Sequence, residues 1–191
     1  PVHAIHQDGK LSKLSAPKGK VLEMQVHRGQ FYLLTEEGVL RLEGEKLQQL
    51  HQASEVTSMA FRGDEIVLGT SDGYYGIDSR SGQESFPRIN KVPVPQITQL
   101  LHTERGLWVA TPQGAFMRKP NGEFRYYASL RWLDQDVVHD MAADSQGNVY
   151  LLTPTGLNKV EFQHHTLAGK ADYYEEKIRQ RHMRYGFIAE L

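Results

Sequence analysis

Histidine is the residue type in this chain best suited to metal binding or to general acid–base chemistry, and the sequence contains nine of them. His164 and His165 are adjacent, so their side chains point in different directions, and His139 lies beside Asp140 in an apolar run. Metal ligands have to converge on one point and need hydrogen-bond partners that orient them. The spacing therefore predicts no metal site.

Catalytic signatures are also missing from the sequence. It has no glycine-rich phosphate loop, no nucleophile elbow, no zinc-binding helix with two histidines and no calcium-binding loop. It has no cysteine, which excludes thiol catalysis and disulfides. We therefore expect no cofactor and no catalytic site within these residues, and the sequence leaves open whether the protein has an enzyme activity.

The charge balance disfavours nucleic acid as a partner. Lys and Arg total 22 and Asp and Glu total 23, so the net charge is −1. A chain that is nearly neutral does not attract a polyanion by its overall charge. The longest uncharged apolar runs, such as residues 31–34 and 107–110, are the length of a strand and too short to span a membrane as a helix. A protein or a carbohydrate remains as the expected ligand, and the oligomeric state is open.

Aromatic residues are the best candidates for binding. Trp132 lies in a polar insertion that joins two of the repeats described below, next to Arg131 and Asp134. Loops at one end of a rigid scaffold commonly carry binding residues, so these three residues are the first candidates for a contact surface. The Tyr74–Tyr75 pair is the next candidate. The alternative is a loop that packs its own tryptophan onto the fold.

A four-fold repeat sets the framework for these residues. Each copy has an apolar run, a threonine, two residues and a glycine, and the threonines are 35, 41 and 42 residues apart. This period suits the four-stranded blade of a β-propeller, whose repeat is about 40 to 50 residues. The copies are residues 31–38, 66–73, 107–114 and 149–156.

Each repeat has room for four strands. An inner apolar run precedes each copy, a third run follows its glycine, and outer strands are predicted at residues 46–50, 83–86 and 123–127. A threonine that ends a central strand can bond into the next turn, and a glycine three residues later permits a positive φ. The predicted class is all-β, a β-propeller of four full four-stranded blades; a β-sandwich is the alternative.

The expected domain is residues 1–162, with a half blade at 1–15 and blades at 20–52, 55–90, 96–130 and 137–162. The half blade favours a fragment of a larger propeller. The competing interpretation is a closed ring of four blades in which residues 10–14 complete the last sheet. The two interpretations differ in their consequences, because the strand edges of an unclosed ring are exposed and can pair with other chains.

Beyond residue 162 the periodicity changes to that of a helix. Apolar residues recur at spacings of three and four, which predicts a helix from about Thr166 to Tyr185 with Thr166 as its N-cap. Residues 163–191 are therefore expected to form a helical connector to a further domain.

The two later repeats, with Trp108, Thr111 and Gly114 and with Asp144 and Gly147, resemble the two-component-regulator propeller repeat of bacteria. The resemblance implies an extracytoplasmic location, periplasmic or secreted, and a non-catalytic module that binds a partner or a glycan-like ligand through its loop face. An accessory propeller of a secreted carbohydrate-active enzyme and a structural scaffold subunit are the alternatives. Fold analogy alone does not choose among them.

Overall fold

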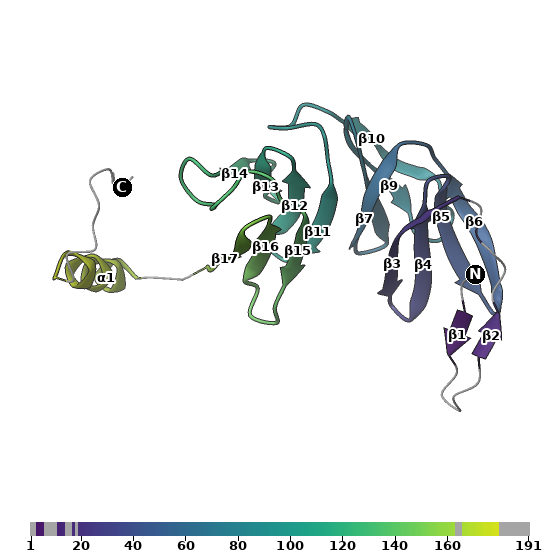
Figure 1. The fold of residues 1–191 in the computed structure, drawn as a ribbon, viewed down its shortest axis with the longest axis horizontal. Helices are drawn as coiled ribbons and strands as arrows, with labels where there is room; N and C mark the ends of the chain where they lie inside the picture. Colours follow the sequence, from purple (N-terminus) through teal and green to yellow (C-terminus); the bar gives the residue numbers. More distant parts are fainter. Residues whose placement is uncertain (1–2, 6–10, 14–16, 18, 163–165, 180–191) are drawn as a thin grey trace. The chain divides into compact units, whose positions relative to one another are not determined.

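The computed structural model describes residues 3–5, 11–13, 17, 19–162 and 166–179. The chain divides into two compact units, residues 1–160 and 161–191. The first unit is built from antiparallel β-sheets, and the second contains a helix (Figure 1).

The four repeats form four separate sheets, called blades 1 to 4 here, and in each the strands are ordered as they are in the chain. Blade 1 consists of β3 (Val21–His27), β4 (Gln30–Thr35), β5 (Gly38–Glu43) and β6 (Lys46–Gln52). Blade 2 consists of β7 (Val56–Arg62), β8 (Glu65–Thr70), β9 (Gly73–Asp78) and β10 (Glu84–Ile89). Blade 3 consists of β11 (Gln99–Thr103), β12 (Gly106–Thr111), β13 (Gly114–Arg118) and β14 (Phe124–Tyr127).

Blade 4 differs from the other three. In the part of the chain that the structure describes, its sheet has three strands, β15 (Asp140–Ala143), β16 (Val149–Thr153) and β17 (Gly156–Val160). The predicted all-β propeller of four blades is confirmed, but the fourth strand expected of blade 4 is not observed. Among the described strands, none pairs with the outer edge of β17, and the next described element along the chain is the helix.

The blades pack side by side through their first two strands. Strand β3 contacts β7, β7 contacts β11, and β11 contacts β15. One apolar cluster joins blades 1 and 2 and includes Leu34 and Met59, and a second joins blades 2 and 3 and includes Tyr74 and Leu100. Every residue of β12 is buried, because this strand is covered on both faces by its neighbours.

The repeated threonine and glycine close the turn after each second strand. The hydroxyl of Thr111 donates to the carbonyl of Gly114 over 2.7 Å, and Thr35 and Thr70 make the same bond over 3.1 and 2.9 Å. The hydroxyl of Thr153 lies 2.9 Å from the equivalent carbonyl of Gly156 and shares its one proton with the Asp134 carboxylate. In blades 1 to 3 the backbone N–H two residues after the threonine also donates to its hydroxyl. Gly114 has a φ of +112°, which side-chain-bearing residues rarely adopt.

Strands β1 (His3–Ile5) and β2 (Leu11–Lys13) pair with each other as an antiparallel hairpin. This is the pairing expected of the predicted half blade. Among the described strands β2 pairs with β1 alone, and the closed ring in which residues 10–14 complete the last sheet stays a prediction.

The second unit contains helix α1 (Leu167–Arg179). Its start is confirmed: the hydroxyl of Thr166 accepts from the N–H of Gly169 over 3.0 Å. The predicted end near Tyr185 lies outside the described residues. No helix in the described part of the chain is long and apolar enough to cross a membrane.

Candidate functional site

The candidate binding loop comprises residues 128–137, between the last strand of blade 3 and the first strand of blade 4. The carbonyl oxygen of Ala128 accepts from the N–H groups of Arg131, Trp132 and Leu133 at 3.2, 2.9 and 3.1 Å. These bonds wind the start of the loop into a compact turn. The carboxylate of Asp136 accepts the N–H of Ser129 over 2.7 Å and closes the loop from its other end.

Trp132 lies at the outer end of a series of aromatic rings. Its side chain is 49% exposed, and its ring meets that of Tyr127 edge to face with centroids 6.4 Å apart. Tyr127 is buried and stacks in turn on the fully buried Trp108, at 5.1 Å. The exposed indole therefore rests on the core of blade 3 and does not extend freely into solvent.

Two guanidinium groups lie over the exposed indole. The Cζ atom of Arg131 is 5.0 Å from the Trp132 centroid and that of Arg125 is 5.8 Å away, both within cation–π range. Arg125 also lies over Tyr127, at 5.6 Å. We call Tyr127, Trp132, Arg125 and Arg131 the Trp132 platform.

Asp134, predicted to contact a ligand, holds the loop against blade 4. Its carboxylate accepts from the hydroxyls of Thr153 and Thr155 at 2.7 and 2.5 Å and from the amide of Asn158 at 2.5 Å. The hydrogen bonds from Thr155, Asn158 and Thr153 lower the pKa of Asp134 well below the usual aspartate range. A carboxylate satisfied in this way is a positioning group for the platform.

Loss of the Asp134 carboxylate should loosen the loop. A folded-state pKa below the unfolded value means that the stabilisation is complete above the unfolded pKa, about 4, and is lost as pH falls below that value. We expect acrylamide quenching of Trp132 fluorescence to be flat from pH 8 to about 5 and to rise below about 4. In Asp134→Asn the quenching should already be raised at neutral pH. A variant that quenches like the wild type throughout would contradict this role.

The Tyr74–Tyr75 pair lies in β9, inside the sheet packing. Tyr74 is 1% exposed, meets Phe86 edge to face at 6.2 Å, and belongs to the cluster between blades 2 and 3. Tyr75 is 8% exposed and belongs to the cluster between blades 1 and 2. The structure does not bring either ring to the Trp132 platform, and neither presents a surface to a partner.

Sequence reasoning missed two polar hollows beside the turns after the first strands. A hollow of about 520 Å³ lies between blades 3 and 4 and is lined by residues such as His102, Glu104, Arg105, Asp144 and Gln146. Burial, and to a smaller extent the charge of Arg62, lowers the pKa of His102. The signal for this hollow in the sequence is two polar turns, which read equally well as hairpin connections.

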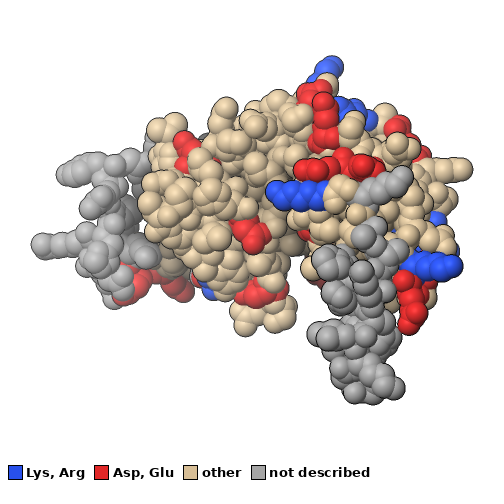
Figure 2. All heavy atoms as spheres, turned by 45° about the vertical axis from the view of Figure 1, so that its right-hand side comes forward, with Lys and Arg blue, Asp and Glu red and all other residues tan. Residues whose placement is uncertain are grey.

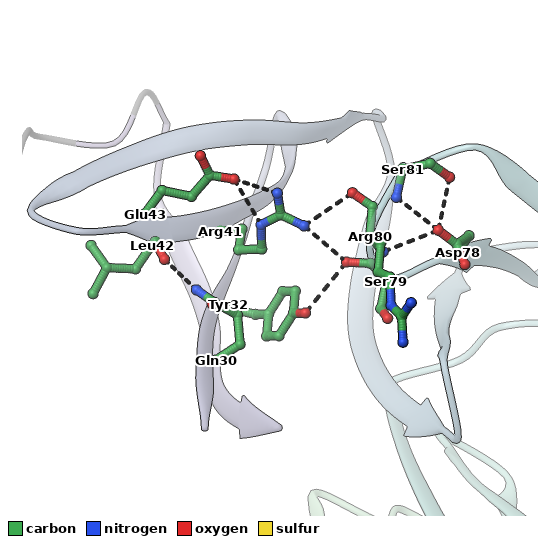
Figure 3. A network of polar contacts seen from close by, with 9 residues as sticks. All are labelled: Gln30, Tyr32, Arg41, Leu42, Glu43, Asp78, Ser79, Arg80 and Ser81. Carbon is green, nitrogen blue, oxygen red and sulfur yellow. Dashed lines mark hydrogen bonds and ion pairs between the residues drawn. The ribbon is translucent and has the colours of Figure 1, made fainter. Parts of the chain in front are cut away.

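The other hollow, of about 240 Å³, lies between blades 1 and 2, beside a network of polar contacts (Figure 3). Arg41 pairs with Glu43 and donates to the backbone carbonyls of Ser79 and Arg80 at 3.4 and 3.0 Å. The Tyr32 hydroxyl reaches the same Ser79 carbonyl at 3.3 Å. These groups satisfy one another and join the two blades.

On the face shown in Figure 2, acidic and basic side chains lie among uncharged ones. Among the residues that the structure describes, no three His, Asp or Glu side chains are grouped so that they could hold a metal ion.

Comparison with known proteins identifies the architecture. No family model matches this chain, and no curated protein matches it. The structure is similar to the extracellular domain of the putative one-component system BT4673 from B. thetaiotaomicron, with a TM-score of 0.64 and 13% identity over 80% of this chain and 23% of that one. The chain has a β-propeller fold.

Two further propellers are similar to it at equally low identity. The extracellular domain of the putative hybrid two-component system BT3049 from B. thetaiotaomicron has a TM-score of 0.58 and 17% identity, over 78% of this chain and 25% of that one. PorZ, a surface component of the type-IX secretion system of Porphyromonas gingivalis, has a TM-score of 0.59 and 11% identity, over 84% and 24%. The chain thus spans about a quarter of the length of these structures.

Proposed function

We propose that the propeller unit is a recognition module that binds a glycan-like ligand at the Trp132 platform, outside the cytoplasm. The main observation behind the proposal is that the Trp132 side chain is exposed to solvent and is also held in place by its neighbours. The indole is 49% exposed, yet it rests on Tyr127 and the loop that carries it is fastened to blade 4 through Asp134. A rigid exposed aromatic ring loses little entropy when a ligand covers it.

The chemistry of the platform matches a sugar ring. The part of the exposed Trp132 indole that Arg125 and Arg131 leave open offers apolar contact to the C–H groups of a pyranose, and the two guanidinium groups provide hydrogen-bond donors and no acceptor. Sugar hydroxyl and carboxylate oxygens accept such bonds. The two arginines therefore favour a glycan that carries acidic groups over a neutral one.

The proposed location rests on the structural similarity. BT4673 and BT3049 are described as having extracellular domains of this fold, at 13% and 17% identity to this chain. A sensor or recognition role outside the cytoplasm fits a propeller, because rigid blades hold loops from distant parts of the sequence around one axis.

Binding is tested by titrating the protein with oligosaccharides, one neutral series and one rich in uronic acids, while following tryptophan fluorescence. The chain has two tryptophans, and Trp108 is fully buried, so a change in emission reports on Trp132. Trp132→Ala should weaken binding measured by calorimetry about tenfold or more, because a central aromatic contact is worth roughly 2 kcal/mol. An unchanged dissociation constant in Trp132→Ala would overturn the assignment of this site.

A protein partner is the second candidate, and it is favoured by Leu130. This side chain is 99% exposed, two residues before Trp132, and its isobutyl group suits an apolar pocket on another protein. Leu130→Ala is therefore both a control and a discriminator. A glycan ligand should bind this variant as it binds the wild type, whereas a protein partner should bind Leu130→Ala and Trp132→Ala more weakly.

A further inference from the structure

The hollow between blades 1 and 2 is lined by more positive than negative side chains. Its charged lining residues are three arginines and one aspartate, namely Arg28, Arg41, Arg80 and Asp64. The whole chain has a net charge of −1, so this excess of positive charge is local. The volume of about 240 Å³ is below the roughly 300 to 1,000 Å³ of pockets that hold a drug-sized ligand. A hollow of this size and charge suits a single anionic group.

One side of the hollow consists of groups that are already bonded to the protein. The Tyr32 hydroxyl donates to a backbone carbonyl of blade 2. Arg41 pairs with Glu43 and donates to two backbone carbonyls, so its guanidinium group is in use (Figure 3). The guanidinium groups of Arg28 and Arg80 are therefore the charged groups that can bind a ligand.

Arg28 and Arg80 share one carboxylate. Arg28 of blade 1 forms an ion pair with Asp64 of blade 2, and a guanidinium nitrogen of Arg80 is 3.7 Å from the same carboxylate oxygen. That distance is too long for a hydrogen bond. Figure 3 shows the Arg80 guanidinium group outside the network that Arg41 makes. Because one carboxylate neutralises only one of the two guanidinium groups, one positive charge beside the hollow has no counter-ion among the described residues.

The backbone of Arg28 lies in a turn that favours other residue types. His27 pairs with Gln30, so Arg28 and Gly29 form a two-residue loop between β3 and β4, and their φ angles are +49° and +76°. Two positive φ angles are typical of a type I′ turn, which favours asparagine followed by glycine. An arginine in this conformation is less stable than an asparagine or a glycine would be. The stability of the turn does not explain this arginine, which supports a role of its side chain in binding.

We propose that the hollow between blades 1 and 2 binds a doubly charged tetrahedral oxyanion, the phosphate or sulfate group of a ligand, between Arg28 and Arg80. A guanidinium group presents parallel N–H donors that match two oxygen atoms of such a group, and hydrogen bonds between charged groups are the strong ones. The carboxylate of Asp64 competes with the ligand for Arg28. This site is built from other blades than the Trp132 platform, and the inference does not depend on ligand binding there.

Binding is tested with inorganic phosphate, sulfate and acetate as separate probes, at about pH 8, where phosphate is doubly charged, and at constant ionic strength. The backbone amide signals of Gly29 and Gly63, measured by NMR, report on the two turns beside the hollow. Phosphate, sulfate or both should shift these signals with a dissociation constant on the order of 1 mM. Acetate carries a single charge and should bind at least tenfold more weakly.

The three probes also distinguish the sources of the oxyanion. If phosphate binds and sulfate does not, the ligand is a phosphate ester, and the reverse result indicates a sulfate ester. Acetate that binds as tightly as the stronger dianion would overturn the proposal. So would the absence of a saturable shift with either dianion up to about 50 mM.

Substitutions separate binding from a structural role. Arg80→Gln should weaken binding of the dianion at least tenfold and leave the thermal unfolding midpoint unchanged, because this side chain is 79% exposed. Arg28→Asn should weaken binding to a similar extent and keep or raise the midpoint, because asparagine suits the turn. Asp64→Asn should tighten binding severalfold, because it removes the competing carboxylate.

Arg88→Gln is the matched control. Arg88 is an exposed arginine of blade 2 that does not line the hollow, so this variant should bind the dianion like the wild type. Equal losses of binding in Arg88→Gln and Arg80→Gln would show a non-specific effect of charge and refute the site. Weaker binding in Asp64→Asn would also contradict the proposal, because a purely structural ion pair between Arg28 and Asp64 predicts that result.

Discussion

Replacing Gly114 with valine is expected to lower the free energy of unfolding by about 3 kcal/mol. Gly114 begins the third strand of blade 3 with a φ of +112°, a conformation that costs other residues roughly 1 to 3 kcal/mol. A Cβ atom added there would also overlap the backbone carbonyl oxygen of Tyr127 in the adjacent strand. Because the obstacle is backbone, side-chain rotation cannot relieve it, and the loss should lie at the upper end of that range.

Gly63→Ala separates the cost of the positive φ from the cost of a steric overlap. Gly63 also has a positive φ, +62°, but an added Cβ meets no atom within 4 Å. Its replacement should cost only about 1 kcal/mol, since strain acts without a clash. Urea denaturation followed by circular dichroism measures both variants. Equal losses at the two positions would show that the approach of Tyr127 to Gly114 has no energetic effect.

Trp108→Ala should cost about 3 to 5 kcal/mol, the usual range for removing a buried tryptophan. Trp108 is fully buried in the second strand of blade 3, where blades cover both faces of the sheet, and its ring stacks on Tyr127. The cavity left by an indole is too large for the neighbouring strands to fill by small movements. The variant should also disturb Trp132, because Tyr127 would lose the ring that supports it.

Trp132→Ala provides the contrast within the same chain. Its ring is half exposed, so we expect a stability loss of about 1 kcal/mol or less, although ligand binding depends on it. Urea denaturation of the two variants, again followed by circular dichroism, compares them directly. If Trp108→Ala were as stable as Trp132→Ala, the series of aromatic rings from core to surface would not be a supporting element of the platform.

The architecture could be predicted because the repeated residues interact within their own turn. Thr111 and Gly114 are three residues apart and close their own turn, so the pattern is visible without knowledge of the rest of the fold. Three copies of this turn with a positive-φ glycine, at Gly38, Gly73 and Gly114, set the period of the blades. The outer strands lie outside the repeat motif, and the sequence indicated them only for the first three repeats, at residues 46–50, 83–86 and 123–127; the described part of blade 4 likewise has three strands.

The candidate site was predicted only in part. Trp132 could be found because a tryptophan in a polar insertion is conspicuous. The partners of Asp134 could not, since Thr153, Thr155 and Asn158 follow 19 to 24 residues later and belong to another blade. Tyr74 and Tyr75 were misleading for a related reason. Adjacent residues of a strand point to opposite faces of the sheet, and both faces of β9 are covered. Tyr74 therefore packs in the cluster between blades 2 and 3, and Tyr75 in the cluster between blades 1 and 2.

The order of the strands within each sheet has a consequence for biosynthesis. In every blade the strands pair with their neighbours in the chain, so a blade needs no residue that follows its own last strand to complete its ladder. As the polypeptide leaves the ribosome, each sheet can close before the next one is translated, and the newly made blade then docks onto a finished surface. Nascent chains stalled after each blade should therefore show stepwise gains in protease resistance.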